Sequence, residues 1–443
     1  MRVNNLKTLL EKQVGWAEQR EAQQYTVTGK MVGFRSLYFR AQPNLRLLHF
    51  CVYSLFIFIV PVSANALEQE VSGYVGLEYR YFPADPSDPR QHGNNASVSI
   101  EPEYYAEWED GQQSFTFKPF ARLDQGDDER SHFDIREMMW LKTEDDWELH
   151  LGVGKVFWGV TEVVHLVDIV NQVDLVEDFF LDERLGQPMV NLALIKDWGT
   201  VDLFILPGFR ERTYPGVNGR PRSIPWVDTA QTTYESSKGK QHVDYAARWS
   251  DSWGDWDIGF NYFNGTSREP RFTVGQSSEG ETVFIPNYDL IAQVSTDIQA
   301  TLEAWLLKFE GYHRSGQGQS YYAATGGFEY SFYGVFESNN DLGIVFEYMY
   351  DQREDDAPTP FQNDFFLGTR LTLNDEQSSD LLAGIIRDFR YNRYYFILEA
   401  SRRVGDSWKV SVDALYFSEP PVSDPGYSFR NDDYLQLEVQ YYF

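Results

Sequence analysis

The chain of 443 residues is almost without thiols, because Cys51 is its only cysteine. Cys51 lies in the apolar run 47–62, and residues 48–51 lack the small side chains of a lipoprotein cleavage site, which argues against lipid anchoring. If this run is a cleaved signal peptide, the mature chain has no cysteine and cannot form disulfide bonds, thiolate metal sites or cysteine nucleophiles. Any chemistry must therefore use oxygen and nitrogen groups.

Long apolar runs are also missing after residue 62, where no stretch approaches the roughly eighteen residues of a membrane-spanning helix. The run 47–62 is short, follows several arginines and ends at Ala64-Asn65-Ala66. This pattern predicts a cleavable signal peptide cut after Ala66, with an uncleaved anchor as the alternative. Residues 1–30 are polar and aperiodic, so either Met31 is the true start or the signal is unusually long.

Basic residues are few, with 38 Lys and Arg against 67 Asp and Glu. Residues 1–66 hold eight of the former and three of the latter, so residues 67–443 carry a net charge of −34. An excess of acid opposes nucleic-acid binding, which depends on a basic surface. It indicates either a solvated acidic exterior, bridged by divalent cations to anionic lipid headgroups, or vestibules that attract cations.

Aromatic residues are abundant, at 16% of the chain, and the last twelve residues alternate in polarity. Leu435, Leu437, Val439, Tyr441 and Phe443 share one face, and Gln436, Glu438 and Gln440 share the other. A period of two is that of a strand, and one apolar and one polar face suit a membrane-spanning barrel with a wet interior and aromatic girdles. A secreted soluble β-sandwich, the alternative, predicts fewer aromatics.

Period-two segments recur along the whole of residues 67–443. Candidate strands are 71–82, 95–108, 113–123, 131–143, 147–157, 188–196, 200–208, 241–250, 255–264, 287–298, 301–312, 320–333, 342–351, 363–373, 380–390, 393–403, 408–417 and 432–443. Short links such as 251–254 alternate with long polar ones such as 158–187, 209–240 and 265–286. We therefore predict an all-β, transmembrane antiparallel up-and-down β-barrel of about 18 strands in one domain, with both termini in the periplasm. Sixteen strands is the alternative, if the pair 380–390 and 393–403 is misread.

The link 158–187 is unusually apolar, and Val160, Val163, Val164 and Val167 fall at helical spacing, which predicts one or two short helices. Such a loop should pack against the inside wall, as an inward-folded third extracellular loop. Its candidate pore-constriction residues are Glu162, His165, Asp168, Asp174, Glu177, Asp178, Asp182, Glu183 and Arg184, facing a basic lumen wall of Arg80, Lys118, Arg122, Arg136, Arg248 and Arg370. Opposite charges on the two sides of the narrowed lumen would select solutes by their size and by their response to the local electric field. Alternatively, the carboxylates only neutralise wall arginines and fix the loop.

Catalytic patterns are absent around the histidines of residues 67–443, none of which lies in a Gly-x-Ser-x-Gly or His-Glu-x-x-His setting. His165 beside Asp168 is the best acid–base candidate, although such histidines more often serve packing. We predict no enzyme, cofactor or metal site. A carbohydrate-binding receptor or adhesin without an open pore is the second hypothesis, with sugars stacking on Tyr214, Trp226, Tyr234 and Tyr288.

The segment Gly152-Val153-Gly154-Lys155-Val156-Phe157-Trp158-Gly159 leads a strand into the apolar loop. With the strand pattern, it resembles Gram-negative general or substrate-selective porins and the larger eighteen-stranded channels, including alginate-export-like barrels. The resemblance implies passive diffusion of small hydrophilic or charged solutes across the bacterial outer membrane. It also implies contact with outer-membrane lipid and lipopolysaccharide, a barrel-assembly machinery that reads Tyr441 and Phe443, and a homo-trimer or a monomer.

Overall fold

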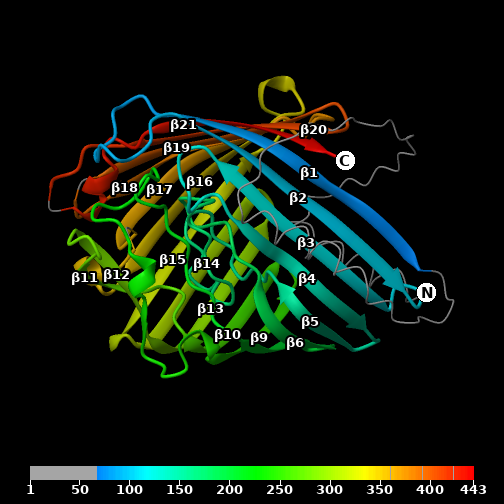
Figure 1. Cartoon of the computed structure of the whole chain (residues 1–443). Helices are drawn as coiled ribbons and strands as arrows, with labels where there is room; N and C mark the ends of the chain where they lie inside the picture. The colour runs from blue at the N-terminus through cyan, green and yellow to red at the C-terminus, as the bar shows by residue number, and fades with distance from the viewer. Residues whose placement is uncertain (1–66, 360, 392, 423) are drawn as a thin grey trace, which may run out of the picture. The chain divides into compact units, whose positions relative to one another are not determined.

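The alternating segments form eighteen strands, each antiparallel to its neighbours in one ring. The ring closes because β1 (Glu68–Tyr81) pairs with both β2 (Asn95–Trp108) and β21 (Tyr434–Tyr442). The remaining strands are β3 (Gln113–Asp124), β4 (Phe133–Thr143), β5 (Trp147–Gly154), β6 (Gln187–Lys196), β7 (Gly199–Pro207), β9 (Val243–Trp253), β10 (Trp256–Thr266), β13 (Leu290–Leu302), β14 (Trp305–Gly316), β15 (Gly318–Phe332), β16 (Asp341–Asp351), β17 (Asn363–Thr372), β18 (Asp380–Asp388), β19 (Tyr394–Val404) and β20 (Trp408–Phe417). The predicted antiparallel barrel of eighteen strands is confirmed, and the alternative of sixteen is wrong (Figure 1).

This computed structural model describes residues 67–359, 361–391, 393–422 and 424–443. The predicted signal peptide and its cleavage residues Ala64 and Ala66 lie outside the described residues. Within the part of the chain that is described, no helix is long and apolar enough to cross a membrane.

A small second sheet lies in the long links, where irregular loops were expected. It contains β8 (Thr233–Tyr234), β11 (Arg271–Gln276) and β12 (Thr282–Tyr288), with β11 antiparallel and β8 parallel to β12. Short 3₁₀ helices are η2 (Thr229–Gln231), η3 (Gly239–Gln241), η4 (Val335–Glu337), η5 (Glu354–Asp356) and η6 (Pro425–Phe429). Because β12 takes residues up to Tyr288 into this sheet, the next barrel strand begins later than the predicted 287.

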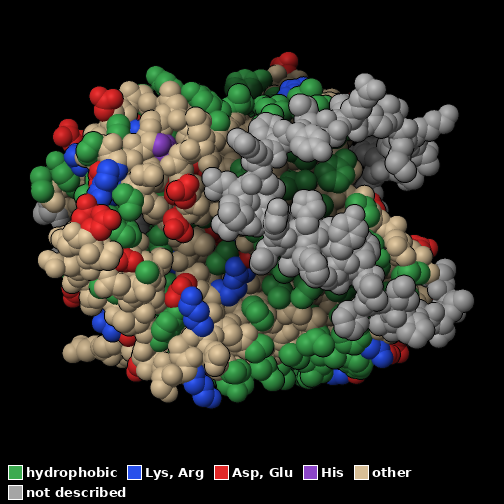
Figure 2. Space-filling model, in the orientation of Figure 1, with side chains coloured by type: hydrophobic (Ala, Val, Ile, Leu, Met, Phe, Trp, Pro, Cys, Tyr) green, Lys and Arg blue, Asp and Glu red, His purple; other side chains and the backbone are tan. Residues whose placement is uncertain are grey.

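The two faces of the strands have opposite character. On β1, Leu77 and Tyr79 are exposed on the outside, whereas Glu78 and Arg80 are buried among groups inside the ring. On β21, Leu437 is exposed outside and Gln436 accepts a hydrogen bond from Arg80. Figure 2 shows hydrophobic side chains along the wall near β5 and β6, and many charged side chains at the end with long loops.

Turn geometry explains two errors in the predicted strand ends. Trp253 pairs with Trp256 across a two-residue turn whose Gly254 has a φ of 66°, so the link is shorter and later than 251–254. The turn between β13 and β14 contains Glu303 with a φ of 55°, a few residues beyond the expected position. Both turns use the left-handed region, which alternation alone does not locate.

The connections are uneven at the end opposite the termini. Long links there include 155–186, 208–242 and 267–289, whereas Gln317 alone separates β14 from β15. The short β18–β19 link, residues 389–393, is also at this end. The long links are therefore grouped on part of the rim, and they determine what covers the opening.

Candidate functional site

Loop 155–186, which joins β5 to β6, reaches the opposite wall of the barrel. Glu310 on β14 accepts hydrogen bonds from the backbone N–H groups of Val160 at 2.7 Å, Thr161 at 3.0 Å and Val167 at 3.2 Å. Along the ring, the four strands β7, β9, β10 and β13 separate β6 from β14. The loop therefore crosses the interior, where Figure 1 shows it in teal within the ring of strands.

A second wall carboxylate continues this contact. Glu347 on β16 accepts hydrogen bonds from the N–H groups of Glu162 at 2.6 Å and Val163 at 3.0 Å. Since these backbone donors are used by carboxylates, they are not available for a helix, and residues 155–186 contain none. The predicted short helices were wrong. Gly159 permits the approach, because a Cβ there would lie 3.0 Å from the Glu310 carboxylate.

The Glu162 side chain makes the principal ion pairs with the far wall. Its carboxylate lies 2.7 Å from Arg370 and 3.4 Å from Lys308. Burial would raise the pKa of Glu162, but the positive charges of Lys308 and Arg370 outweigh it and lower the pKa to about 2. The residue is therefore a stable anion at neutral pH.

Two further carboxylates of the loop bind arginines on the near wall. Asp174 lies 2.7 Å from Arg136, and Glu177 lies 2.8 Å from both Arg122 and His132. Burial would raise the pKa of Glu177, but the charge of Arg122 and the hydrogen bond from His132 hold it well below its usual range. These pairs fasten the middle of the loop to β3 and to the β4 side of the ring.

The remaining predicted loop residues contact one another more than the wall. Asp168 pairs with Arg184 at 2.8 Å, and the His165 ring lies 3.3 Å from Asp182 rather than bonding to Asp168. Asp178 accepts hydrogen bonds from the N–H groups of Phe180 and Asp182, and Glu183 lies 3.0 Å from Lys155. Burial and the nearby Asp182 raise the pKa of Asp178 to about 6.

Only some of the predicted wall residues therefore face the loop. Arg122, Arg136 and Arg370 meet its carboxylates, whereas Lys118 pairs with Glu103 and Arg248 with Asp297 on neighbouring strands. Arg80 contacts Glu78 at 3.2 Å and reaches the loop only through the Glu177 carbonyl at 3.5 Å. Sequence reasoning missed Arg130, Lys308, Glu310 and Glu347. For Lys308, Glu310 and Glu347 the available signal was their alternation with outward apolar residues, whereas Arg130 lies in the link between β3 and β4, where no such pattern exists.

Loop 208–242 also crosses the opening, in the outer part of the barrel. It leaves β7 and returns to β9, yet Arg220 pairs with Asp432 at 2.7 Å beside β21, and Arg222 pairs with Asp88 at 2.8 Å beyond β1. The N–H of Gly216 donates to Asp127 at 3.1 Å in the β3–β4 link. Because the five strands β2 to β6 separate β1 from β7 along the ring, this loop also reaches across the opening.

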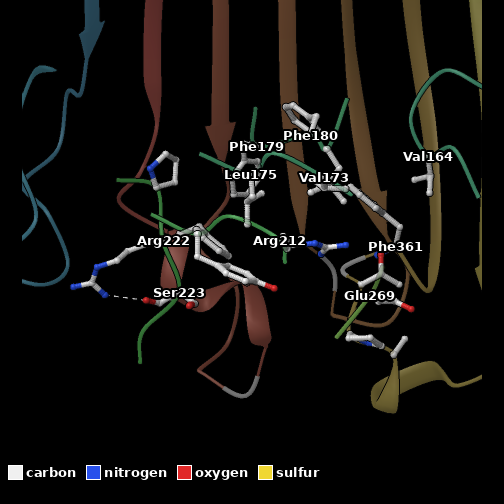
Figure 3. A pocket seen from close by; sticks show the side chains of 18 of the residues that line it. Val164, Val173, Leu175, Phe179, Phe180, Arg212, Arg222, Ser223, Glu269 and Phe361 are labelled. Atoms are coloured by element: carbon white, nitrogen blue, oxygen red, sulfur yellow. Dashed lines mark hydrogen bonds between the residues drawn. The ribbon is translucent and has the colours of Figure 1, made fainter. Parts of the chain in front are cut away.

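A chamber of about 890 Å³ lies between the two crossing loops. Its walls come from both loops and from the links that follow β10, β16 and β20. Figure 3 shows Val173, Leu175 and Phe179 of loop 155–186 on one side, with Arg212 and Arg222 of loop 208–242 beneath them. The opening of the barrel therefore leads into a bounded space rather than directly into the lumen.

Three of the four aromatic residues proposed to stack on sugars are buried or stacked on another ring. Tyr288 is 1% exposed and Tyr214 is 9% exposed, so neither presents a ring face to solvent. Tyr234 stacks on Tyr288 with ring centroids 5.8 Å apart. Tyr214, Tyr234 and Tyr288 therefore offer no free ring face for a sugar, whereas Trp226 in loop 208–242 is partly exposed.

The fold is similar to several solved structures. OccK8 (OprE) of Pseudomonas aeruginosa aligns at 11% identity and a TM-score of 0.50, over 85% of this chain and 98% of that chain. OmpT, an outer membrane protein of Vibrio cholerae, aligns at 9% identity and a TM-score of 0.44, over 86% and 100% of the two chains. A porin of Rhodopseudomonas blastica aligns at 11% identity and a TM-score of 0.41, over 85% and 100%. No protein-family model and no curated protein matches the sequence.

These likenesses concern the fold. The likeness to OccK8 and the closed ring of eighteen antiparallel strands define the class of fold, an antiparallel β-barrel. What passes through it has to be argued from its own residues.

Proposed function

We propose that the protein is a channel in the bacterial outer membrane through which small hydrophilic or charged solutes diffuse. The observation that carries the proposal is the segregation of the barrel wall, which is apolar outside and charged inside. An apolar outer belt suits lipid, and a charged inner face requires water. In this arrangement the termini and short turns face the periplasm, and the long links, near lipopolysaccharide, face the exterior.

Loop 155–186 is the constriction in this proposal. Its crossing contacts with Glu310 and Glu347 support a fixed position in the lumen. Asp174 and Glu177 are fully paired with wall arginines, which supports a role in fixing the loop. Glu162 and the partly exposed Arg370 are better placed to act on a passing ion, so we assign the field at the constriction to this pair.

Planar-bilayer recording of the purified barrel tests the proposal. We expect stepwise ion conductance, and a larger conductance when residues 162–184 are deleted, because the deletion removes the segment that crosses the lumen. Since this deletion leaves Arg122 and Arg136 without loop partners, folding is first checked by heat-modifiable migration on gels. A folded barrel that does not conduct would contradict the channel, and an unchanged conductance after the deletion would contradict the constriction.

A further inference from the structure

The small sheet of β8, β11 and β12 has an edge that no other strand of the described residues covers. The sheet places β12 in the middle, with β8 on one side and β11 on the other. Five of the six residues of β11 are exposed, and Val274 is 70% exposed. An edge of this kind presents unpaired backbone N–H and C=O groups and is a template for a further strand.

The hydrogen bonds of β12 show which backbone groups of β11 point outward. On the side away from β11, the Phe284 N–H donates to the Trp226 carbonyl at 2.9 Å, and the Phe284 carbonyl accepts from the Asp228 N–H at 2.8 Å. Val274 lies directly opposite Phe284, and opposite residues of an antiparallel pair exchange either both bonds or neither. The N–H and carbonyl of Val274 therefore point away from β12. The same holds for Phe272, two residues earlier, because the pattern has a period of two.

This edge lacks the features that usually protect an exposed strand. Charged side chains, prolines and bulges normally prevent an edge from pairing with another chain. Residues 272–276 contain no charge and no proline, and their pairing with β12 has no register shift. The two residues whose backbone groups point outward, Phe272 and Val274, are also apolar. The edge is therefore suited to receive a strand.

The hairpin of β11 and β12 lies across the mouth of the barrel. It follows β10 and leads into β13, and at its tip Glu281 pairs with Arg90 of the β1–β2 link at 2.6 Å. Seven strands, β2 to β7 and β9, separate β10 from β1 along the ring. Loop 208–242 contacts the β12 side of the hairpin, and the Phe272 side chain lines the chamber. The free edge is therefore at the outer end of the barrel, on the side of the hairpin that this loop leaves uncovered.

We propose that the β11 edge is a docking site for an extended segment of another protein, which adds to the small sheet as a fourth strand antiparallel to β11. The main chain of a strand repeats donors and acceptors at the spacing that Phe272 and Val274 present, so a peptide backbone is the ligand that fits. Apolar side chains at alternate positions of the segment would lie beside Phe272 and Val274. Two copies of this chain in one membrane hold their edges over separate mouths, so the partner is a different protein.

Binding of a synthetic peptide to the full barrel in lipid nanodiscs tests the proposal. The probe is a fluorescein-labelled peptide of sequence Thr-Val-Thr-Phe-Thr-Val-Thr, and its binding is followed by fluorescence anisotropy. In an antiparallel pair, the residues of the probe that bond to β11 are those whose side chains share a face with Val274. Methylation of the backbone nitrogens of its Val and Phe residues should therefore weaken binding at least about tenfold, whereas methylation at its Thr residues should leave binding unchanged. Equal effects of the two methylations would overturn the proposal.

Val274→Pro is the corresponding change in the barrel. It removes an outward N–H that has no partner within the sheet, so it should weaken probe binding at least about tenfold without loss of heat-modifiable barrel. Thr273→Ser is the matched control, because the Thr273 backbone pairs with Ile285 of β12 and the hydroxyl is retained, so its affinity should be unchanged. Full probe affinity in Val274→Pro would contradict the docking site. Barrel dimers in sedimentation that Val274→Pro dissociates would also contradict it, since a second copy would then occupy the edge.

Discussion

At the scale of residues, the interior is a network in which charges are matched across strands and loops. Glu78 alone contacts Arg80, Arg122 and Arg130, and Arg122 continues the network to Glu177. Ions removed from water are tolerated only when such partners and hydrogen bonds compensate for lost solvation. A change at one member therefore alters the charge that its partners present to the lumen.

Glu162→Gln is the most direct test of this coupling. Removing the carboxylate leaves Arg370 and Lys308 without its negative charge, so the reversal potential in a salt gradient should shift toward anion preference. Because Glu162 and Arg370 are partly exposed, we expect a loss of only about 2 kcal/mol in the free energy of unfolding. Glu144→Gln, in a short turn, is the control and should change neither quantity. An unaltered reversal potential in Glu162→Gln would argue that the pair is purely structural.

Asp178 predicts a pH dependence near neutrality. Its pKa is raised by burial and by Asp182 to about 6, so folding favours the protonated acid. The stabilisation from this group is complete below the unfolded pKa and is lost as the pH rises through about 6. Infrared difference spectra against Asp178→Asn should show a protonated-acid carbonyl band with that midpoint. Asp182→Asn should lower the midpoint, and a band that titrates near 4 in the unaltered protein would contradict the assignment.

At the scale of elements, alternation predicted the strands well and the loop contacts poorly. A period of two placed Arg122 and Arg370 on the inner face, because successive side chains of a strand point to opposite sides. Nothing local indicated that Glu310 would receive N–H groups from Val160 and Thr161, since these segments meet only after the ring has closed. Likewise, the spacing of the valines predicted a helix. In the structure the wall carboxylates of Glu310 and Glu347 accept the backbone N–H groups at the start of that segment.

Glu310→Gln tests how far one acceptor holds the loop. The carboxylate oxygen Oε1 accepts from Val160, Thr161 and the Thr161 hydroxyl, and an amide offers one acceptor oxygen where the carboxylate offers two. We expect a loss of about 2 to 4 kcal/mol and larger open-channel current fluctuations, because charged hydrogen bonds weaken. Glu109→Gln, at a turn remote from the loop, should leave the current noise unchanged. Equal noise in both variants would show that other contacts suffice.

At the scale of the whole molecule, the terminal strand completes the ring. The strand β21 pairs with β20 on one side and β1 on the other, and the Phe443 N–H donates to the Gly73 carbonyl at 3.0 Å. The exposed side chains of Tyr441 and Phe443 face outward, where a membrane-assembly factor could reach them. We propose that they form the assembly signal.

Deletion of Phe443 should therefore lower the yield of heat-modifiable barrel in outer membranes, while single-channel conductance of the molecules that do fold stays the same. Phe336→Ala is a suitable control, because Phe336 is 88% exposed in a short turn but lies far from the terminus in sequence. Normal assembly without Phe443 would contradict the signal. A changed conductance would instead indicate that the closure affects the lumen.

The contacts of loop 155–186 have a mechanical consequence. A ring of eighteen strands can be flattened by lateral pressure from the bilayer, because its strands are joined only edge to edge. Here the loop is fastened through Arg136 and Arg122 to one wall and through Glu310, Glu347 and Arg370 to the opposite wall. The loop therefore links the two walls at a fixed separation, and the width of the passage should vary little with membrane tension.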